Sequence, residues 1–127
     1  VYCYSMHVGR NYPSRKEPGD MDVELDRFVS GDAYLEPLRA TLPGVVKAFE
    51  PDIAFYIAGA DVHRDDRFGQ MMLSSEQMRE RDGFAIRTLR QSAAATVVVY
   101  GGGYNKTPGV TGQLHVQTIK IAAGSSA

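Results

Sequence analysis

Residues 53–61 read Ile-Ala-Phe-Tyr-Ile-Ala-Gly-Ala-Asp, and residues 96–105 read Thr-Val-Val-Val-Tyr-Gly-Gly-Gly-Tyr-Asn. Each stretch begins with a nearly continuous apolar run of strand length, as expected of a buried strand in a parallel sheet. Glycine follows each run, and then comes a chemically capable side chain, the carboxylate of Asp61 or the phenol of Tyr104. Because open α/β sheets bind ligands at the carboxyl ends of their strands, the two stretches predict a site containing Asp61 and Tyr104.

The sequence before these stretches alternates strand-like and helical segments. Residues 1–6 and 21–25 are predicted to be strands, separated by a long loop. A helix is expected to follow, with Asp32 as its cap. Pro37 and Pro43 lie inside that helix and predict a kink or a split.

The sequence between and after the two stretches predicts two further helices. Ser74 and Gln77 have the spacing of a capping box, so a helix is expected to begin there. The charged segment 79–82 is interpreted as the solvated face of that helix. The last helix is expected over residues 108–121 or 110–121. Helices that alternate with apolar strands predict an α/β fold with a parallel sheet flanked by helices.

Composition excludes several classes of protein. The chain has 127 residues, which predicts one domain. Its formal net charge of -1 does not indicate a basic surface that would bind nucleic acid or an anionic membrane. No apolar run approaches the ~20 residues that a membrane-spanning helix needs. Cys3 is the single cysteine, which rules out an internal disulfide and fits a reducing compartment. We therefore expect a cytoplasmic protein in which Cys3 is a small buried apolar residue.

The chain begins within a strand-like run, Val1-Tyr2-Cys3-Tyr4-Ser5-Met6. Natural domains seldom begin inside a buried element. We therefore expect residues 1–127 to be the carboxyl-terminal part of a single longer domain.

Asp61 allows two interpretations. A carboxylate at the end of a buried strand costs free energy unless it is paired, hydrogen-bonded or bound to a metal. Asp61 is therefore either a metal ligand or a local cap that pairs with Arg64 or Arg67. His63 lies two residues on and formally completes an Asp-x-His pair, but we expect its side chain to be solvated.

Tyr104 also allows more than one interpretation. The three glycines before it let the backbone pass close to a ligand, and a tyrosine held there can donate its phenolic hydrogen to a developing oxyanion. A tight turn with an ordinary packed tyrosine is the structural alternative. A phosphate-binding loop is the least favoured interpretation, because the lysine in residues 101–107 is not at the distance from the glycines that this motif requires.

Several short motifs occur in a characteristic order along the chain: Ser5-Met6-His7, Asn11-Tyr12-Pro13, Asp20-Met21-Asp22-Val23, Gly31-Asp32, Tyr34-Leu35, Pro51-Asp52, Ala58-Gly59-Ala60-Asp61, Asp66-Arg67-Phe68-Gly69, Leu73-Ser74, Arg81-Asp82 and Gly101-Gly102-Gly103-Tyr104. Together they resemble the zinc-dependent histone deacetylase family, and most closely its bacterial and class IV-like branch. The resemblance covers about residues 1–123. It implies part of an arginase/deacetylase-like α/β fold.

The resemblance implies a role for five residues, each by its matching position. Asp61 would be the zinc-ligating aspartate, and Tyr104 would polarise the acetyl carbonyl and stabilise the tetrahedral intermediate. Tyr12 matches an aromatic residue of the narrow acyl-lysine tunnel. Phe68 matches a rim position where the family usually has leucine or methionine, and the backbone of Gly102 would line the tunnel.

Other family features are absent from the sequence. The remaining two zinc ligands come, in the family, from an Asp-x-His on a preceding strand, and its paired general-base histidines lie further upstream. Neither pair is present here, and Asp61-Val62-His63 stands at the third-ligand position.

Ser5 and Met6 match positions whose carbonyl groups help to bind a structural monovalent cation in many members.

The resemblance implies a zinc-dependent amide hydrolase that converts an acetylated lysine or an acetylated small amine to the free amine and acetate. With one carboxylate and one phenol, the 127-residue chain is expected to be inactive alone and to bind zinc weakly. The alternative is a non-catalytic α/β module that binds a partner along an exposed sheet edge. No direct nucleic-acid or membrane partner is expected, and the oligomeric state is left open.

Overall fold

A computed structural model describes residues 1–93 and 95–124 of the chain. Within them, six strands and three helices follow one another in the order β1 (Tyr4–Val8), β2 (Met21–Leu25), β3 (Val29–Ser30), α1 (Gly31–Phe49), β4 (Ile53–Ala58), β5 (Met71–Met72), α2 (Ser75–Ser92), β6 (Ala95–Tyr100) and α3 (Val110–Ala122). The strands form three parallel pairs, β1 with β2, β3 with β5, and β4 with β6. The predicted α/β class with parallel strands and flanking helices is confirmed.

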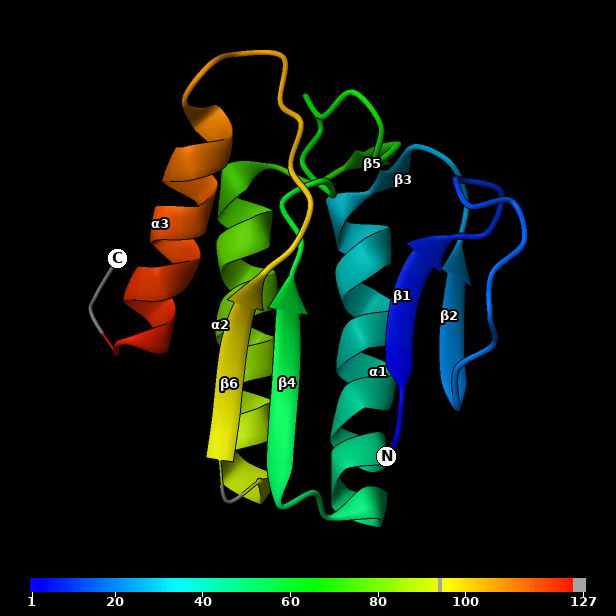
Figure 1. Cartoon of the computed structure of the whole chain (residues 1–127), viewed down its shortest axis with the longest axis vertical. Helices are drawn as coiled ribbons and strands as arrows, with labels where there is room; N and C mark the ends of the chain where they lie inside the picture. The colour runs from blue at the N-terminus through cyan, green and yellow to red at the C-terminus, as the bar shows by residue number, and fades with distance from the viewer. Residues whose placement is uncertain (94, 125–127) are drawn as a thin grey trace.

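The pair β4–β6 determines where the site lies. Its register runs from Ile53 opposite Ala95 to Ala58 opposite Tyr100, so both strands end at the same edge (Figure 1). The residues that follow the two strands are therefore neighbours, although they are distant in the sequence. This is the arrangement that the two apolar runs predict.

The helices pack side by side in the order α1, α2, α3, and α2 also packs on β4 and β6 (Figure 1). The N-cap of α1 is Ser30, whose hydroxyl accepts a hydrogen bond from Ala33 N, so the prediction of Asp32 as the cap is wrong. Asp32 lies in the first turn and accepts a hydrogen bond from Gln77 of α2 at 3.0 Å. The capping box of Ser74 and Gln77 is present as predicted.

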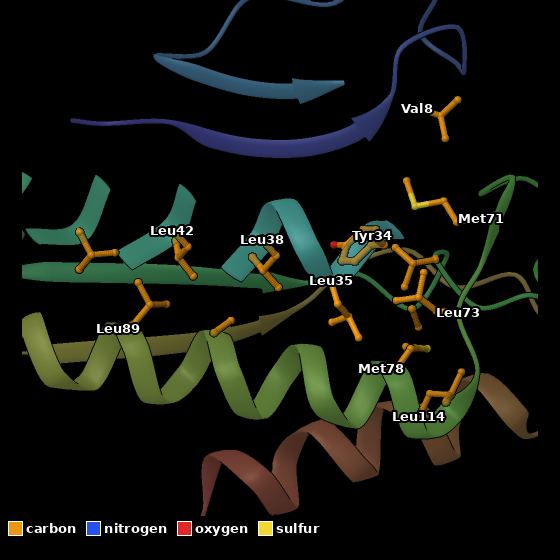
Figure 2. Close-up of a cluster of buried hydrophobic side chains, with 14 residues drawn as sticks. Val8, Tyr34, Leu35, Leu38, Leu42, Met71, Leu73, Met78, Leu89 and Leu114 are labelled. Atoms are coloured by element: carbon orange, nitrogen blue, oxygen red, sulfur yellow. The ribbon is translucent and has the colours of Figure 1, made fainter. Parts of the chain in front are cut away.

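The two prolines do not split α1, which runs unbroken from Gly31 to Phe49. Its buried stripe includes Leu35, Leu38 and Leu42, and these side chains face α2 (Figure 2). Burying such side chains stabilises the helix by about 1.5–3 kcal/mol each, which offsets the backbone hydrogen bond that each proline removes. The core continues through a larger set that includes Val8, Tyr34, Met71, Leu73, Met78, Leu89 and Leu114.

The prediction that β4 and β6 are buried on both faces is wrong. Ala54 and Tyr56 point toward the core, whereas Phe55 and Ile57 are 68% and 69% exposed. The alternation arises because, within the described residues, helices pack on one face of this pair. An apolar surface of Ile53, Phe55, Ile57, Val97 and Val99 lies on the other face.

The prediction of a solvated face at residues 79–82 is wrong for two of its members. Arg81 is 4% exposed and Asp82 is fully buried. Asp82 accepts hydrogen bonds from Tyr56 of β4 and Thr118 of α3, both at 2.6 Å, and pairs with Arg81 at 2.8 Å. Arg81 also donates to the carbonyl oxygen of Gly59 at 2.7 Å. This buried network fastens α2 to the end of β4 and to α3.

The termini differ slightly from the predicted boundaries. β1 begins at Tyr4 and continues to Val8, so Cys3 precedes the strand and is exposed, contrary to the prediction that it is buried. α3 begins at Val110, one of the two predicted starts, and ends at Ala122. None of the helices in the described part of the chain is long and apolar enough to cross a membrane.

Candidate active site

Asp61 lies on the loop that follows β4, here called the Asp61 loop (residues 59–69). The Tyr104 loop (residues 101–107), which follows β6, packs against it, and Ala60 N donates to the carbonyl oxygen of Gly102 at 2.6 Å. A Cβ added to Gly102 would lie 3.0 Å from Asp61 Oδ2, and one added to Gly69 would lie 1.5 Å from the Asp61 carbonyl oxygen. Glycine at these two positions therefore lets the backbone close around Asp61.

The surroundings of the Asp61 carboxylate on balance disfavour its negative charge. Burial raises its pKa and the negative charge of Asp66 raises it further, while its own backbone amide and the Arg81 guanidinium lower it by less. Among residues 1–93 and 95–124, no side chain donates a hydrogen bond to this carboxylate and no ion pair includes it. A half-buried carboxylate in this state is destabilised unless a cation binds it, so Asp61 fits a metal ligand.

The described residues do not hold a complete metal site. No group of three or more His, Cys, Asp or Glu side chains in this part of the chain could hold a metal ion. Zinc needs three protein ligands in a catalytic site. A zinc site that includes Asp61 would therefore need more ligands than the described residues bring together.

Tyr104 lies on the neighbouring loop and is 53% exposed, so it is not a core tyrosine. Its ring packs edge-on against Phe68, with ring centroids 5.3 Å apart and planes at 69°. Phe68 belongs to the Asp61 loop and is itself exposed. The structure therefore brings Asp61, Phe68, Gly102 and Tyr104 together at the carboxyl ends of β4 and β6.

Tyr12 lies on a third loop, which contacts the first. Asn11 donates its side-chain amide to the carbonyl oxygens of Phe68 at 2.8 Å and Gly69 at 3.3 Å. The Lys16 ammonium donates to the carbonyl oxygens of Gly9, Asn11 and Pro13 at 2.7–3.1 Å and holds this loop in shape. Tyr12 itself follows Asn11 on this loop and is 93% exposed.

His63 is not solvated, contrary to the prediction. It is 5% exposed, Asn105 donates to its Nδ1 at 2.9 Å, and its Nε2 pairs with the Ser75 hydroxyl at 3.3 Å. Burial lowers its pKa. Both ring nitrogens are thus used in joining the Asp61 loop to Asn105 and to the start of α2. The hydrogen bonds of His63 are therefore structural, and His63 does not complete an Asp-x-His pair with Asp61.

Sequence reasoning missed Asp66. Its Oδ1 accepts hydrogen bonds from Phe68 N at 2.8 Å and Gly69 N at 2.9 Å, and its Oδ2 accepts one from Tyr104 N at 2.5 Å. The local part of this pattern is an Asx turn, for which an aspartate just before Arg-Phe-Gly is a recognisable signal. No local sequence pattern predicts the hydrogen bond from Tyr104 N to Asp66, because the two residues are 38 positions apart.

Comparison with known proteins connects this arrangement to a family. The histone deacetylase domain matches residues 1–119. An uncharacterized protein from Picosynechococcus is 33% identical over 106 residues, which are 84% of this chain and 35% of that protein. Histone deacetylase 2 of Arabidopsis thaliana is 30% identical over 110 residues, 84% of this chain and 28% of that protein.

A solved structure has the same fold. The acetylpolyamine aminohydrolase of Burkholderia pseudomallei superposes with a TM-score of 0.70 at 19% identity, covering 95% of this chain and 36% of that one. The chain thus spans about a third of the length of the relatives that it matches. From the match over nearly its whole length, the chain belongs to the histone deacetylase family.

Proposed function

We propose that residues 1–127 are the carboxyl-terminal part of a zinc-dependent deacetylase domain, which hydrolyses an acetylated lysine or an acetylated small amine to the free amine and acetate. One observation carries this proposal: among the described residues the half-buried Asp61 carboxylate forms no ion pair and accepts no side-chain hydrogen bond, and it lies next to the loop that presents Tyr104. Family membership and the names of two matched proteins, a histone deacetylase and an acetylpolyamine aminohydrolase, support the substrate class.

Asp61 would hold the metal through its carboxylate, which is one of the ligand types that zinc accepts. Bound zinc would supply a Lewis acid for the acyl oxygen and lower the pKa of a bound water. The other ligands, and a base that removes a proton from the water, would come from outside these 127 residues. We therefore expect this chain alone to be inactive and to bind zinc weakly.

Tyr104 would donate its phenolic hydrogen to the acyl oxygen as negative charge develops there. Donors of this kind act because they are already in position before the charge forms. Phe68, Tyr12 and the backbone of Gly102 would line the approach for the acyl-amine chain, and the contact between Phe68 and Tyr104 supports this assignment. A structural monovalent cation at the carbonyls of Ser5 and Met6, and a cytoplasmic location, stay predictions.

A deacetylase assay on a fluorogenic acetyl-lysine peptide and on an acetylated polyamine tests the proposal. It compares this chain with a version extended upstream through an Asp-x-His and a histidine pair. Activity and about one zinc per chain are expected in the extended protein only. Tyr104→Phe in that protein is expected to lower kcat by about 100- to 1,000-fold, because one oxyanion donor is lost.

Tyr100→Phe is the matched control. It removes the same hydroxyl from a tyrosine four positions away on β6, whose ring packs on His115 and not on the Asp61 loop. Wild-type activity is expected in this variant. An extended protein without zinc and without activity on either substrate would contradict the proposal and favour a non-catalytic binding module.

A further inference from the structure

Backbone hydrogen bonds join the Asp61 loop to the Tyr104 loop. Arg67 N donates to the carbonyl oxygen of Tyr104 at 3.3 Å, and Lys106 N donates to that of Asp65 at 3.1 Å. Asp66 and Asn105 form an antiparallel bridge between them. The Arg67 contact is slightly longer than a normal N–H···O hydrogen bond and the Lys106 contact is of normal length. With the bond from Ala60 N to the Gly102 carbonyl oxygen at 2.6 Å, they form the backbone part of the junction between the two loops.

The Asp66 carboxylate spans both loops. One oxygen accepts the amides of Phe68 and Gly69 within its own loop, and the other accepts the amide of Tyr104 at 2.5 Å. Hydrogen bonds to an ionised acceptor are shorter and about twice as strong as neutral ones. Asp66 is thus the one described side chain that bonds the backbone of Tyr104 itself.

We propose that Asp66 is a positioning residue, which fixes the backbone of Tyr104 relative to Asp61 so that the phenol and the metal ligand keep one relative position. This proposal rests on the proposed function. In this proposal Asp66 acts through the backbone of Tyr104 and takes no direct part in the reaction. The His63–Asn105 hydrogen bond at 2.9 Å is a second side-chain tie between the same loops, one residue beyond Tyr104.

The geometry also explains why the position of Tyr104 is sensitive to this contact. The ring of Tyr104 is held by Phe68, and Phe68 N is bonded to the same carboxylate. Loss of Asp66 therefore releases the Tyr104 backbone and the ring support together. A displacement of about 1 Å at a catalytic group can cost about 100-fold in rate.

Amide hydrogen exchange in the full 127-residue chain, measured by NMR, tests the contact without any need for activity. In Asp66→Ala the Tyr104 amide is expected to exchange roughly 10- to 100-fold faster, because a charge-assisted hydrogen bond is lost. The matched control is Asp65→Ala, which removes a neighbouring carboxylate that is 55% exposed, lies 4.0 Å from His63 Nδ1 and accepts no backbone amide among the described residues. Wild-type exchange of Tyr104 is expected in that control.

Asp66→Asn is the second variant, for the case in which Asp66→Ala does not fold. A single amide oxygen cannot serve both loops, so faster exchange is expected at Tyr104 or at the pair Phe68 and Gly69. Exchange at the wild-type rate at Tyr104 in Asp66→Ala, or at all three amides in Asp66→Asn, would overturn the proposal.

Kinetics of the upstream-extended protein separate positioning from mere stability. Asp66→Ala is expected to lower kcat about 100-fold with KM and zinc content nearly unchanged, and Asp66→Asn should recover part of kcat. A higher KM with normal kcat would overturn the positioning role. An inactive wild-type extended protein would overturn the proposed function, and the exchange rates alone would then decide whether Asp66 joins the two loops.

Discussion

Replacing Asp82 with alanine is expected to destabilise this fold more than almost any other single change. Asp82 is fully buried and is the acceptor for Tyr56 and Thr118 and the ion-pair partner of Arg81. Its removal leaves the Arg81 guanidinium, 4% exposed, without its ion-pair partner, and leaves the Tyr56 hydroxyl without its acceptor. The Thr118 hydroxyl keeps only its hydrogen bond to the Leu114 carbonyl oxygen, at 3.2 Å.

The size of the effect follows from the buried charge. Breaking a buried ion pair by removing one partner costs about 3–5 kcal/mol, and a domain of this kind has only about 5–15 kcal/mol of unfolding free energy. With a urea m-value of about 2 kcal/mol/M, a loss of about 4 kcal/mol lowers the unfolding midpoint by about 2 M.

Urea unfolding followed by far-UV circular dichroism measures this loss. Glu80→Ala is the matched control: it removes a carboxylate from the same helix, whose ion pair with Arg39 is about half exposed on both sides and contributes about 0–1 kcal/mol. If Asp82→Ala does not fold, Thr118→Val removes one of the donors and is expected to cost about 1.5–3 kcal/mol. A change below about 1 kcal/mol in Asp82→Ala, with an unchanged m-value, would refute the reasoning.

Three further predictions concern other parts of the fold. Burial raises the pKa of Tyr56, so the folded state holds the Tyr56 proton more tightly than the unfolded state, and the unfolding free energy should fall as pH rises above about 10. Tyr56→Phe should be less stable than the wild type at pH 8 but lose less unfolding free energy above pH 10. Equal slopes of unfolding free energy against pH in the two proteins would contradict this prediction. Gly69→Ala should destabilise the fold by about 3 kcal/mol or more, because its Cβ would lie 1.5 Å from the Asp61 carbonyl oxygen. Gly44→Ala should stabilise the fold by about 0.5–1 kcal/mol, because Gly44 lies inside α1 and has open space where the Cβ would be. The exposed apolar surface on β4 and β6 is expected to make the chain self-associate, and Phe55→Ser, which replaces a side chain 68% exposed, should reduce that association at nearly unchanged stability. Analytical ultracentrifugation measures it, and either a monomeric wild type or undiminished association in the variant would contradict the prediction.

The parts of the fold that were predictable are those set by local pattern. Two apolar runs of strand length, each followed by glycine, were enough to predict parallel strands that end at one edge, and the capping box predicted the start of α2. These signals work because backbone conformation and the choice of strand or helix depend mostly on neighbouring residues. The meeting of the Asp61 and Tyr104 loops followed from the shared direction of β4 and β6.

Burial of polar side chains was not predictable in this way. Arg81 and Asp82 lie in a charged segment that reads as solvated, and their partners Tyr56 and Thr118 are 26 and 36 positions from Asp82. His63 also lies among charged residues, yet it is buried and hydrogen-bonded to Asn105, 42 positions away. The contacts that decide burial are long-range, so a local pattern does not contain them.

The buried network around Asp82 has a consequence for how the chain acquires its structure during synthesis. Asp82 and Arg81 emerge from the ribosome well before Thr118, which is 36 positions later on α3. Until α3 has docked, one side of α2 stays open and Asp82 lacks one of its donors. Completion of this unit must therefore wait for α3, and the open side of α2 is until then a surface of the kind that makes partly folded chains prone to aggregation.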